Sequence, residues 1–136
     1  MPYVLQERRP ALDAVVEEMI VLEPTTWDIE AFLIHLAQGS DRGLTLTDKF
    51  RPLLEAVKIA DAKPNGDLNY ILFKYAKYHI KPSYNNYKAY IGVIHRAMGK
   101  IDKKDYIDEY REAVAEIRRR ILGPYEDQKE IENGSV

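Results

Sequence analysis

The residues best suited to binding chemistry lie in one stretch, from Lys74 to Lys104. This stretch holds eight Lys or Arg residues against a single acid, Asp102. Aromatic residues are interleaved with the cations: Tyr75, Tyr78, Tyr84, Tyr87, Tyr90, His79 and His95. Ammonium groups neutralise phosphate and aromatic rings stack on bases, so the combination predicts a phosphate-bearing ligand. A solvated helix face backed by a tyrosine-rich core would show the same pattern, and both interpretations stay open.

Spacing separates the tyrosines that pack from those that could bind. Tyr84 and Tyr87 fall on the apolar stripe of a predicted helix and are expected to pack. Tyr78 and Tyr90 lie off the main stripes and are better ligand candidates. The full set of predicted ligand-binding residues is Asn69, Tyr70, Lys77, Tyr78, Lys81, Tyr90, Arg119, Arg120 and Tyr125.

A second basic cluster consists of Arg118, Arg119 and Arg120. Guanidinium groups can bind phosphate or carboxylate through two parallel hydrogen bonds. The same arginines would also complement the negative end of their own helix, which is expected to stop near Gly123. Ion pairs between these arginines and Glu126 or Asp127 would be an equally simple structural role.

Several kinds of chemistry are excluded or disfavoured. The chain has no cysteine, which rules out disulfides, thiolate metal sites and cysteine nucleophiles. The three histidines share no metal-ligand spacing, no glycine-rich phosphate loop is present, and no cofactor is expected. Carboxylate pairs such as Asp108 and Glu109 are predicted to be exposed, where they make poor general acids near neutral pH. A small enzyme using Asp67, Asn69, Tyr70 and an arginine is the least favoured interpretation.

The elements that must position these residues are helices. A chain of 136 residues with 46% hydrophobic and 31% charged residues suits one globular domain, spanning 1–136. Apolar residues recur at three-and-four spacing, and proline, glycine and capping residues divide the pattern into segments near 10–22, 26–39, 50–57, 67–82, 84–98 and 107–121. Thr25 or Thr26, Asp67 and Ser83 are the predicted N-caps. The fold class is therefore all-α, a compact multi-helix bundle.

The last two predicted helices have heptad-like apolar seams. This favours an antiparallel C-terminal helical hairpin within the bundle, although the seams would also suit a homo-oligomer interface. Residues 1–10 are interpreted as an N-terminal arm, residues 39–43 as a loop, and residues 124–136 as a charged tail. No apolar run approaches the roughly 18–20 residues of a membrane helix, so we expect no membrane association and a cytoplasmic location.

Short motifs spread along the chain resemble a family of small uncharacterised bacterial and phage proteins. They are Met1–Arg9, Gly66–Tyr70, Tyr90–Val93, Arg119-Arg120, Pro124–Asp127, Lys129 and Glu132–Gly134. The chain departs from the pattern at Arg118, where tyrosine is expected, and at Ser135, where aspartate is expected. The resemblance implies a compact intracellular protein, carried by a mobile element, and no established reaction.

The leading hypothesis is a non-enzymatic binding protein that holds a nucleotide-like ligand or nucleic acid on its Lys/Arg/Tyr-rich surface. A homo-oligomer is compatible with this hypothesis. The net charge of −2 means that any such affinity depends on local clustering. The alternative is a protein–protein adaptor or inhibitor that contacts a host protein through helix faces and the charged tail. The two differ in whether partner binding depends on a nucleotide.

Overall fold

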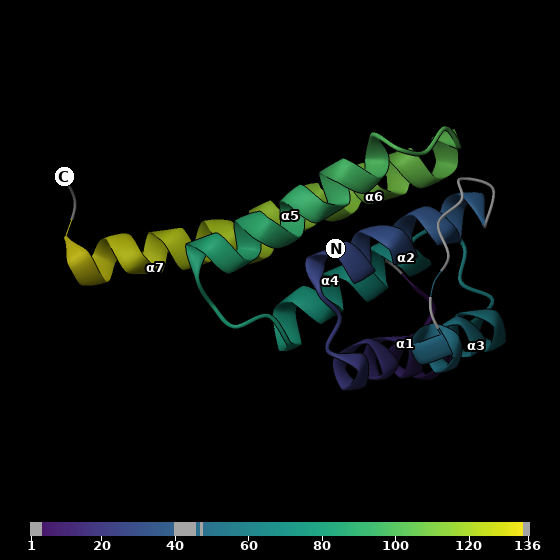
Figure 1. The fold of residues 1–136 in the computed structure, drawn as a ribbon. Helices are drawn as coiled ribbons and strands as arrows, with labels where there is room; N and C mark the ends of the chain where they lie inside the picture. The colour runs from purple at the N-terminus through teal and green to yellow at the C-terminus, as the bar shows by residue number, and fades with distance from the viewer. Residues whose placement is uncertain (1–3, 40–45, 47, 135–136) are drawn as a thin grey trace.

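The described part of the chain is helical throughout and contains no strand (Figure 1). The computed structural model describes residues 4–39, 46 and 48–134. Its elements are η1 (Gln6–Arg8), α1 (Arg9–Leu22), α2 (Thr26–Gln38), η2 (Asp48–Phe50), α3 (Arg51–Ala60), α4 (Asp67–Tyr78), α5 (Tyr84–Met98), α6 (Lys104–Ile117), η3 (Arg118–Leu122) and α7 (Gly123–Asn133). The predicted all-α multi-helix bundle is confirmed. The loop predicted at 39–43, apart from Gly39, and Ser135 lie outside the described residues.

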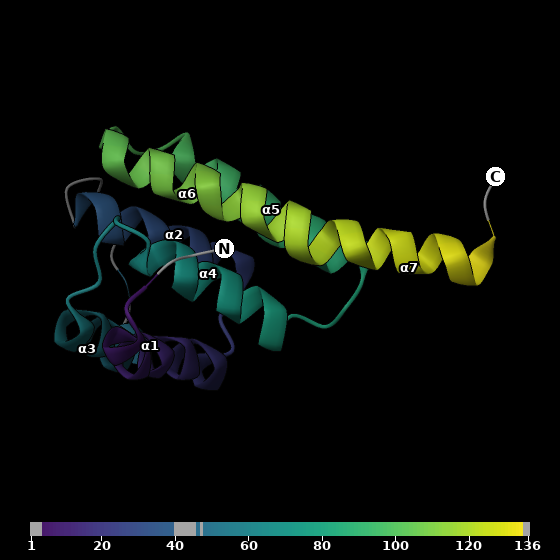
Figure 2. The same cartoon turned by 180° about the vertical axis from the view of Figure 1, so that it is seen from behind.

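The helices form three layers, with α4 and α2 in the middle (Figures 1 and 2). Helices α1 and α3 pack together, and α1 also packs on α4. On the other side, α4 packs on α6 and α2 packs on α5, while α5 and α6 form the predicted hairpin. The hairpin prediction is confirmed within one chain. The middle position of α4 matters most here, since it contacts both outer layers.

Local sequence explains where the helices begin. The Thr25 hydroxyl accepts the Asp28 N–H at 3.1 Å while the Asp28 carboxylate accepts the Thr25 N–H at 2.9 Å, a complete capping box for α2. Ser83 caps α5 by accepting the Asn86 N–H at 3.0 Å. Pro52 stands in the first turn of α3, where its missing N–H is tolerated.

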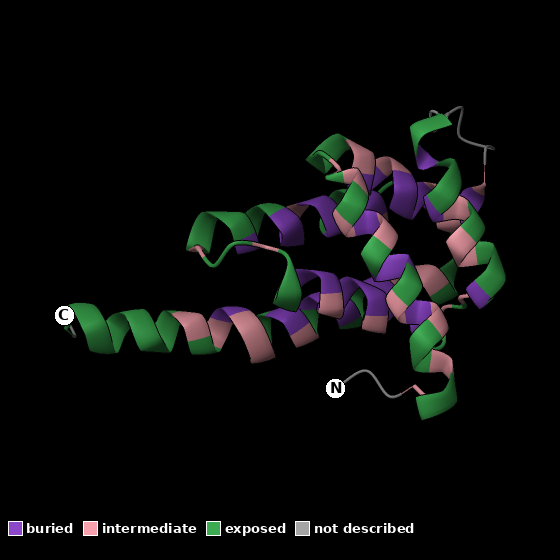
Figure 3. Cartoon of the chain, turned by 90° about the horizontal axis from the view of Figure 1, so that it is seen from below, coloured by how far each residue is buried: buried purple, intermediate pink, exposed green. Residues whose placement is uncertain are grey.

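The buried hydrophobic residues form one core cluster, and Figure 3 shows the buried positions in purple along the packed helices. Two tyrosines pin neighbouring layers by donating their hydroxyls to backbone carbonyls: Tyr110 to Leu33 at 2.7 Å, and Tyr90 to Leu72 at 2.9 Å. Such bonds let a large ring be buried without leaving its hydroxyl unpaired. Burial raises the pKa of both phenols well above its usual value. Tyr90, which the sequence placed off the buried stripes, is only 3% exposed, so that prediction is wrong.

The C-terminal end of the chain differs from the prediction. Instead of ending near Gly123, α6 continues through the π-helical turn η3 into α7, and together they form one long rod. Figure 2 shows α7 projecting beyond the end of α5. The segment predicted to be a charged tail is therefore helical from Gly123 to Asn133.

Candidate functional site

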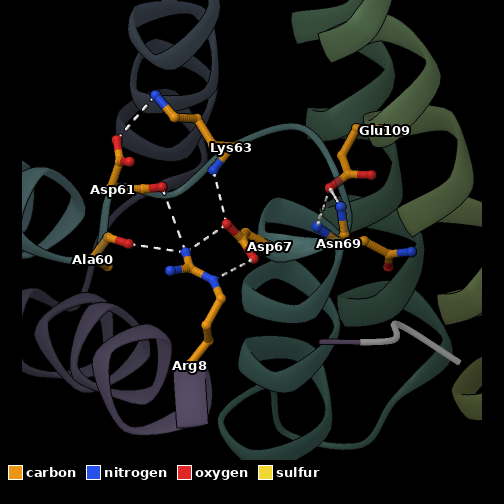
Figure 4. A network of polar contacts seen from close by, with 8 residues as sticks. Arg8, Ala60, Asp61, Lys63, Asp67, Asn69 and Glu109 are labelled. Carbon is orange, nitrogen blue, oxygen red and sulfur yellow. Dashed lines mark hydrogen bonds and ion pairs between the residues drawn. The ribbon is translucent and has the colours of Figure 1, made fainter. Parts of the chain in front are cut away.

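The N-terminal end of α4 is held by a dense polar network (Figure 4). Arg8 donates to both carboxylate oxygens of Asp67, at 2.7 Å from Nη2 and 3.4 Å from Nε, and to the Ala60 carbonyl at 2.9 Å. The Lys63 N–H also donates to Asp67 at 3.0 Å. Asp67 is not the N-cap that the sequence predicted. Gly66, with φ of 112°, occupies that position, and Asp67 is the first helical residue.

Glu109 from α6 secures the same helix end from the other side. Its Oε2 accepts the Gly66 N–H at 2.7 Å and the Asn69 N–H at 3.2 Å, which are amides that a helix N-terminus leaves without internal partners. Burial raises the pKa of Glu109, although the two amide donors act in the opposite direction. The side chain is 6% exposed, so the predicted exposure of Glu109 is wrong. This network fixes α4 between α1 and α6.

Further along α4 a cleft opens between α1, α4 and η3. Its volume is about 190 Å³. The lining consists of cations and aromatic rings: Arg9, Tyr70, Phe73, Lys74, Lys77, Tyr78 and Arg120. None of these lining residues is acidic. We call this set the basic cleft.

Three separate elements supply the cleft. Residues 70, 74 and 77 follow one another at four- and three-residue spacing, which places them on one face of α4. Arg9 is the first residue of α1, brought to α4 by the packing of these two helices. Arg120 comes from η3, over 40 residues further along the sequence. The site therefore exists only in the folded bundle.

The π turn places Arg120 in the cleft, and Gly123 and Pro124 account for the turn. Proline has no N–H to donate to the carbonyl four residues back, and its ring clashes with that carbonyl in a regular α-helix. In η3 the Gly123 N–H instead reaches back five residues to the Arg118 carbonyl. A Cβ on Gly123 would lie 3.1 Å from that oxygen, so only glycine fits comfortably. The wider turn lets the helix pass through a Gly-Pro pair.

Two of the lining residues, Tyr70 and Lys74, donate hydrogen bonds to the same carboxylate oxygen. Asp13 accepts hydrogen bonds from Lys74 Nζ at 2.6 Å and from the Tyr70 hydroxyl at 2.7 Å. Burial by itself would lower the pKa of Lys74, but its bonds to Asp13 and Tyr70 outweigh burial and the pKa is raised. Burial raises the pKa of Tyr70. At neutral pH the cleft therefore contains a charged Lys74 and a neutral phenol.

The remaining cations of the cleft are less engaged. Lys77 Nζ lies 5.4 Å from the ring centre of Tyr78 and forms no ion pair in the described residues. The Arg9 side chain likewise forms no hydrogen bond or ion pair within that part of the chain. The Arg120 guanidinium lies over the Phe73 ring at 4.9 Å and its Nη1 is 4.0 Å from Glu116. The cleft thus has a net positive charge, which suits an anion.

The other predicted ligand-binding residues lie elsewhere. Asn69 and Tyr90 are buried, at 4% and 3% exposure. Arg119 pairs with Glu116 at 2.7 Å, not with the acids of residues 126–127. Lys81 follows α4 as an exposed cation, and Tyr125 packs edge-on against Tyr87 at 5.7 Å.

The structure thus brings four of the nine predicted residues into the cleft: Tyr70, Lys77, Tyr78 and Arg120. The predicted set of ligand-binding residues missed Arg9, Phe73 and Lys74, although Lys74 lies at the start of the basic stretch. The position of Arg9 at the start of a predicted helix could have indicated it. A cation there interacts unfavourably with the helix dipole, which suggests a role other than stabilising the helix.

An acidic pocket of about 460 Å³ lies at the opposite end of α4. Its acids are Asp105, Asp108, Glu109 and Glu112. Asp108 forms ion pairs with Lys104 at 2.8 Å and Arg111 at 3.2 Å. Glu109 accepts the Gly66 N–H at the N-terminal end of α4. Among the described residues, no group of three or more His, Asp or Glu side chains has a geometry that could hold a metal ion. Structural roles account for these two acids.

Comparison with known proteins places the chain in a family. All of residues 1–136 match a domain of unknown function, DUF6899. The chain belongs to this family. No curated protein and no solved structure matches it. Membership agrees with the resemblance to an uncharacterised family and brings no activity with it. Within the described ranges, no DUF6899 helix is long and apolar enough to cross a membrane.

Proposed function

We propose that this DUF6899 protein is a binding protein that holds a nucleotide-like anion in the basic cleft. The observation that carries the proposal is the convergence of Arg9, Lys77 and Arg120 around aromatic rings, with no acid in the lining. Arg9 and Lys77 form no ion pair in the described residues, whereas Arg120 lies 4.0 Å from Glu116. A phosphate group would supply the charge that the cleft lacks, through charge-assisted hydrogen bonds.

The aromatic residues give the ligand a second feature, a flat ring. Tyr78 is 65% exposed, and Lys74 and Lys77 lie 5.8 Å and 5.4 Å from its ring centre. A base stacked on this ring would place its phosphate near the same lysines. The size of the cleft, about 190 Å³, suits a phosphate and the edge of a ring rather than a length of polymer. This favours a nucleotide over nucleic acid.

The lining also argues for binding rather than catalysis. Its side chains are Arg, Lys, Tyr and Phe, without a carboxylate or histidine that could act as a general base near neutral pH. The Tyr70 phenol has a raised pKa, and its hydroxyl donates a hydrogen bond to Asp13. These residues are arranged to hold an anion without transforming it.

The proposal is tested by calorimetric titration of the full chain with ATP, inorganic pyrophosphate and adenosine. ATP and pyrophosphate are expected to bind, and uncharged adenosine to bind much more weakly. Lys77→Ala should weaken ATP binding about tenfold, the equivalent of about 1.4 kcal/mol for one lost charge-assisted contact. Lys58→Ala is the matched control, because Lys58 is an exposed helical lysine outside the cleft.

Two results would overturn the proposal: no binding of either phosphate compound at low salt, or equal ATP affinity in wild type and Lys77→Ala. A single-stranded oligonucleotide that binds more tightly than ATP, with a steep salt dependence, would instead identify nucleic acid as the ligand. Mass spectrometry of small molecules released from the denatured protein then identifies the natural ligand.

A further inference from the structure

Helix α7 is the most exposed element of the molecule. It continues the α6 rod past the end of α5, and Figure 3 shows it exposed over most of its length. From Glu126 to Asn133 every residue is exposed, and Ile131 is 76% exposed. Only Tyr125, at the base, packs on a neighbouring helix. Although α7 extends the α6 rod, it gains little from packing within the chain, and most helical stability in proteins comes from packing, so a second surface would favour it.

The charge of α7 is opposite to that of helices α4 and α5. Four carboxylates and one cation lie between Gly123 and Asn133. Lys129 pairs with Glu132 at 3.1 Å, whereas Glu126 and Asp127 form no ion pair with any described residue. By contrast, residues 68–101 contain six Lys or Arg and no acid.

The basic counterpart of α7 is a surface that includes the cleft and the cations next to it. Lys77, Lys81 and Lys88 are exposed and form no ion pair within the described part of the chain. Two large aromatic side chains accompany them: Tyr78 at 65% exposure, and Tyr84 at 49%, so the prediction that Tyr84 packs is wrong. The surface therefore offers cations for carboxylates and rings for an aliphatic side chain such as Ile131.

We propose that α7 of one copy docks on the basic surface of a second copy. Glu126 and Asp127 would approach Lys77 and Lys81, and Ile131 would cover an exposed tyrosine ring. A symmetric dimer satisfies both copies at once, because each contributes one acidic helix and one basic surface. Reciprocal docking also doubles the buried area, which a single helix of about 16 Å would leave small.

This inference rests on the same excess of cations as the proposed function, but not on the identity of the ligand. A phosphate compound in the cleft and the carboxylates of α7 would compete for Lys77. Ligand binding is therefore expected to weaken the dimer, and dimer formation to weaken ligand binding by the same factor. Because the opposed charges are exposed, association should also decrease as salt rises.

Sedimentation equilibrium of the full chain at low salt tests the proposal through a charge swap. The first variant is Glu126→Lys with Asp127→Lys, and the second is Lys77→Glu with Lys81→Glu. Each is expected to weaken dimerisation at least about tenfold, as measured for close opposed charges in other complexes. The variant that combines all four substitutions restores opposite charges and should regain most of the affinity.

A matched control is Glu17→Lys with Glu55→Lys, two exposed acids of α1 and α3. This pair changes the net charge as much as the α7 variant and should leave dimerisation unchanged. Far-ultraviolet circular dichroism verifies that each variant is folded. A monomeric wild type at low salt, an α7 variant that dimerises like wild type, or a fourfold variant that stays as weak as the two doubles would each overturn the proposal.

The α7 variant also separates this inference from the proposed function. Glu126→Lys with Asp127→Lys leaves every cleft residue intact, so ATP binding should persist or tighten while dimerisation is lost. If ATP does not bind but the charge swap behaves as expected, only the proposed function fails. If ATP binds and the wild type is monomeric, only the dimer fails.

Discussion

Charged residues near the two ends of α4 differ in whether they have ion-pair partners. The neighbours Arg8 and Arg9, at the start of α1, show the contrast directly. Arg8 donates to both oxygens of Asp67 and to the Ala60 carbonyl. Its neighbour Arg9 lines the basic cleft and has no ion pair in the described residues. One arginine is fully engaged in holding the fold together, while the other faces a cavity.

The contrast indicates which charges need a functional explanation. At the N-terminal end, buried Asp67 and Glu109 receive donors from Arg8 and from backbone amides, so stability accounts for them. At the cleft, Arg9 stands at the first residue of a helix, where a positive charge is unfavourable. A charge that costs stability and meets no partner is better explained by a ligand. The predictions below test this division.

The largest effect is expected at Asp67. Asp67→Ala should lower the free energy of unfolding by about 3 kcal/mol, because it removes one partner of a mostly buried ion pair; Arg8 stays partly solvated, which limits the loss. The side chain of Asp67 is 4% exposed and that of Arg8 is 35% exposed. Urea unfolding followed by circular dichroism measures the change.

Asp61→Ala is the control for that prediction. Asp61 also forms an ion pair, with Lys63 at 2.9 Å, but the two side chains are 75% and 57% exposed. Exposed pairs contribute less than about 1 kcal/mol. Equal losses for the two variants would show that the Arg8–Asp67 network does not anchor α4.

Much of the fold could be predicted from the sequence because its signals are local. The capping residue of α5, the proline of α3 and the apolar stripe of Leu68, Ile71 and Leu72 each act within a few residues. The seams of α5 and α6 also predicted their pairing. The π turn could not be predicted, because Gly-Pro ordinarily ends a helix. Here a change of hydrogen-bond register carries the helix onward.

The predicted part of the candidate site lies mostly on one element, and Arg120 was added from its own cluster of arginines. Tyr70, Lys77 and Tyr78 are close in sequence, so their grouping shows in the charge and aromatic pattern. Arg9 reaches them through the packing of α1 on α4, which no local pattern encodes. Glu109 was missed for a related reason. A carboxylate in an acid-rich segment is expected to be exposed. Glu109 is buried instead because the backbone amides of Gly66 and Asn69, distant in the sequence, donate hydrogen bonds to it.

A smaller and pH-dependent effect is expected at Glu109. Glu109→Ala leaves the Gly66 and Asn69 amides without an acceptor and should cost about 2 kcal/mol. Glu109→Gln keeps an acceptor and removes the charge, so its cost at neutral pH should be below about 1 kcal/mol. Comparing the two variants with wild type by urea unfolding separates the acceptor from the charge.

The sign of the pH dependence follows from the raised pKa of Glu109. A raised folded pKa favours the folded state most when pH is below the unfolded pKa, about 4.3. That contribution is lost as pH rises through the folded pKa. Wild type should therefore lose stability relative to Glu109→Gln over this rise. A constant difference across it would show that burial does not perturb Glu109.

The smallest effect on stability is expected at Arg9, and this prediction is the sharpest test of the comparison. Arg9→Ala should change the free energy of unfolding by less than about 0.5 kcal/mol, and in the stabilising direction, because it removes a cation from a helix N-terminus and adds a better helix former. Arg8→Ala, one residue away, should cost several times more, because it leaves Asp67 buried with only the Lys63 amide. The same Arg9→Ala protein should bind ATP more weakly than wild type in calorimetric titration. A variant that gains stability and loses affinity identifies Arg9 as a binding residue, whereas a loss of stability comparable to that of Arg8→Ala would make both arginines structural and remove the distinction between the two ends of α4.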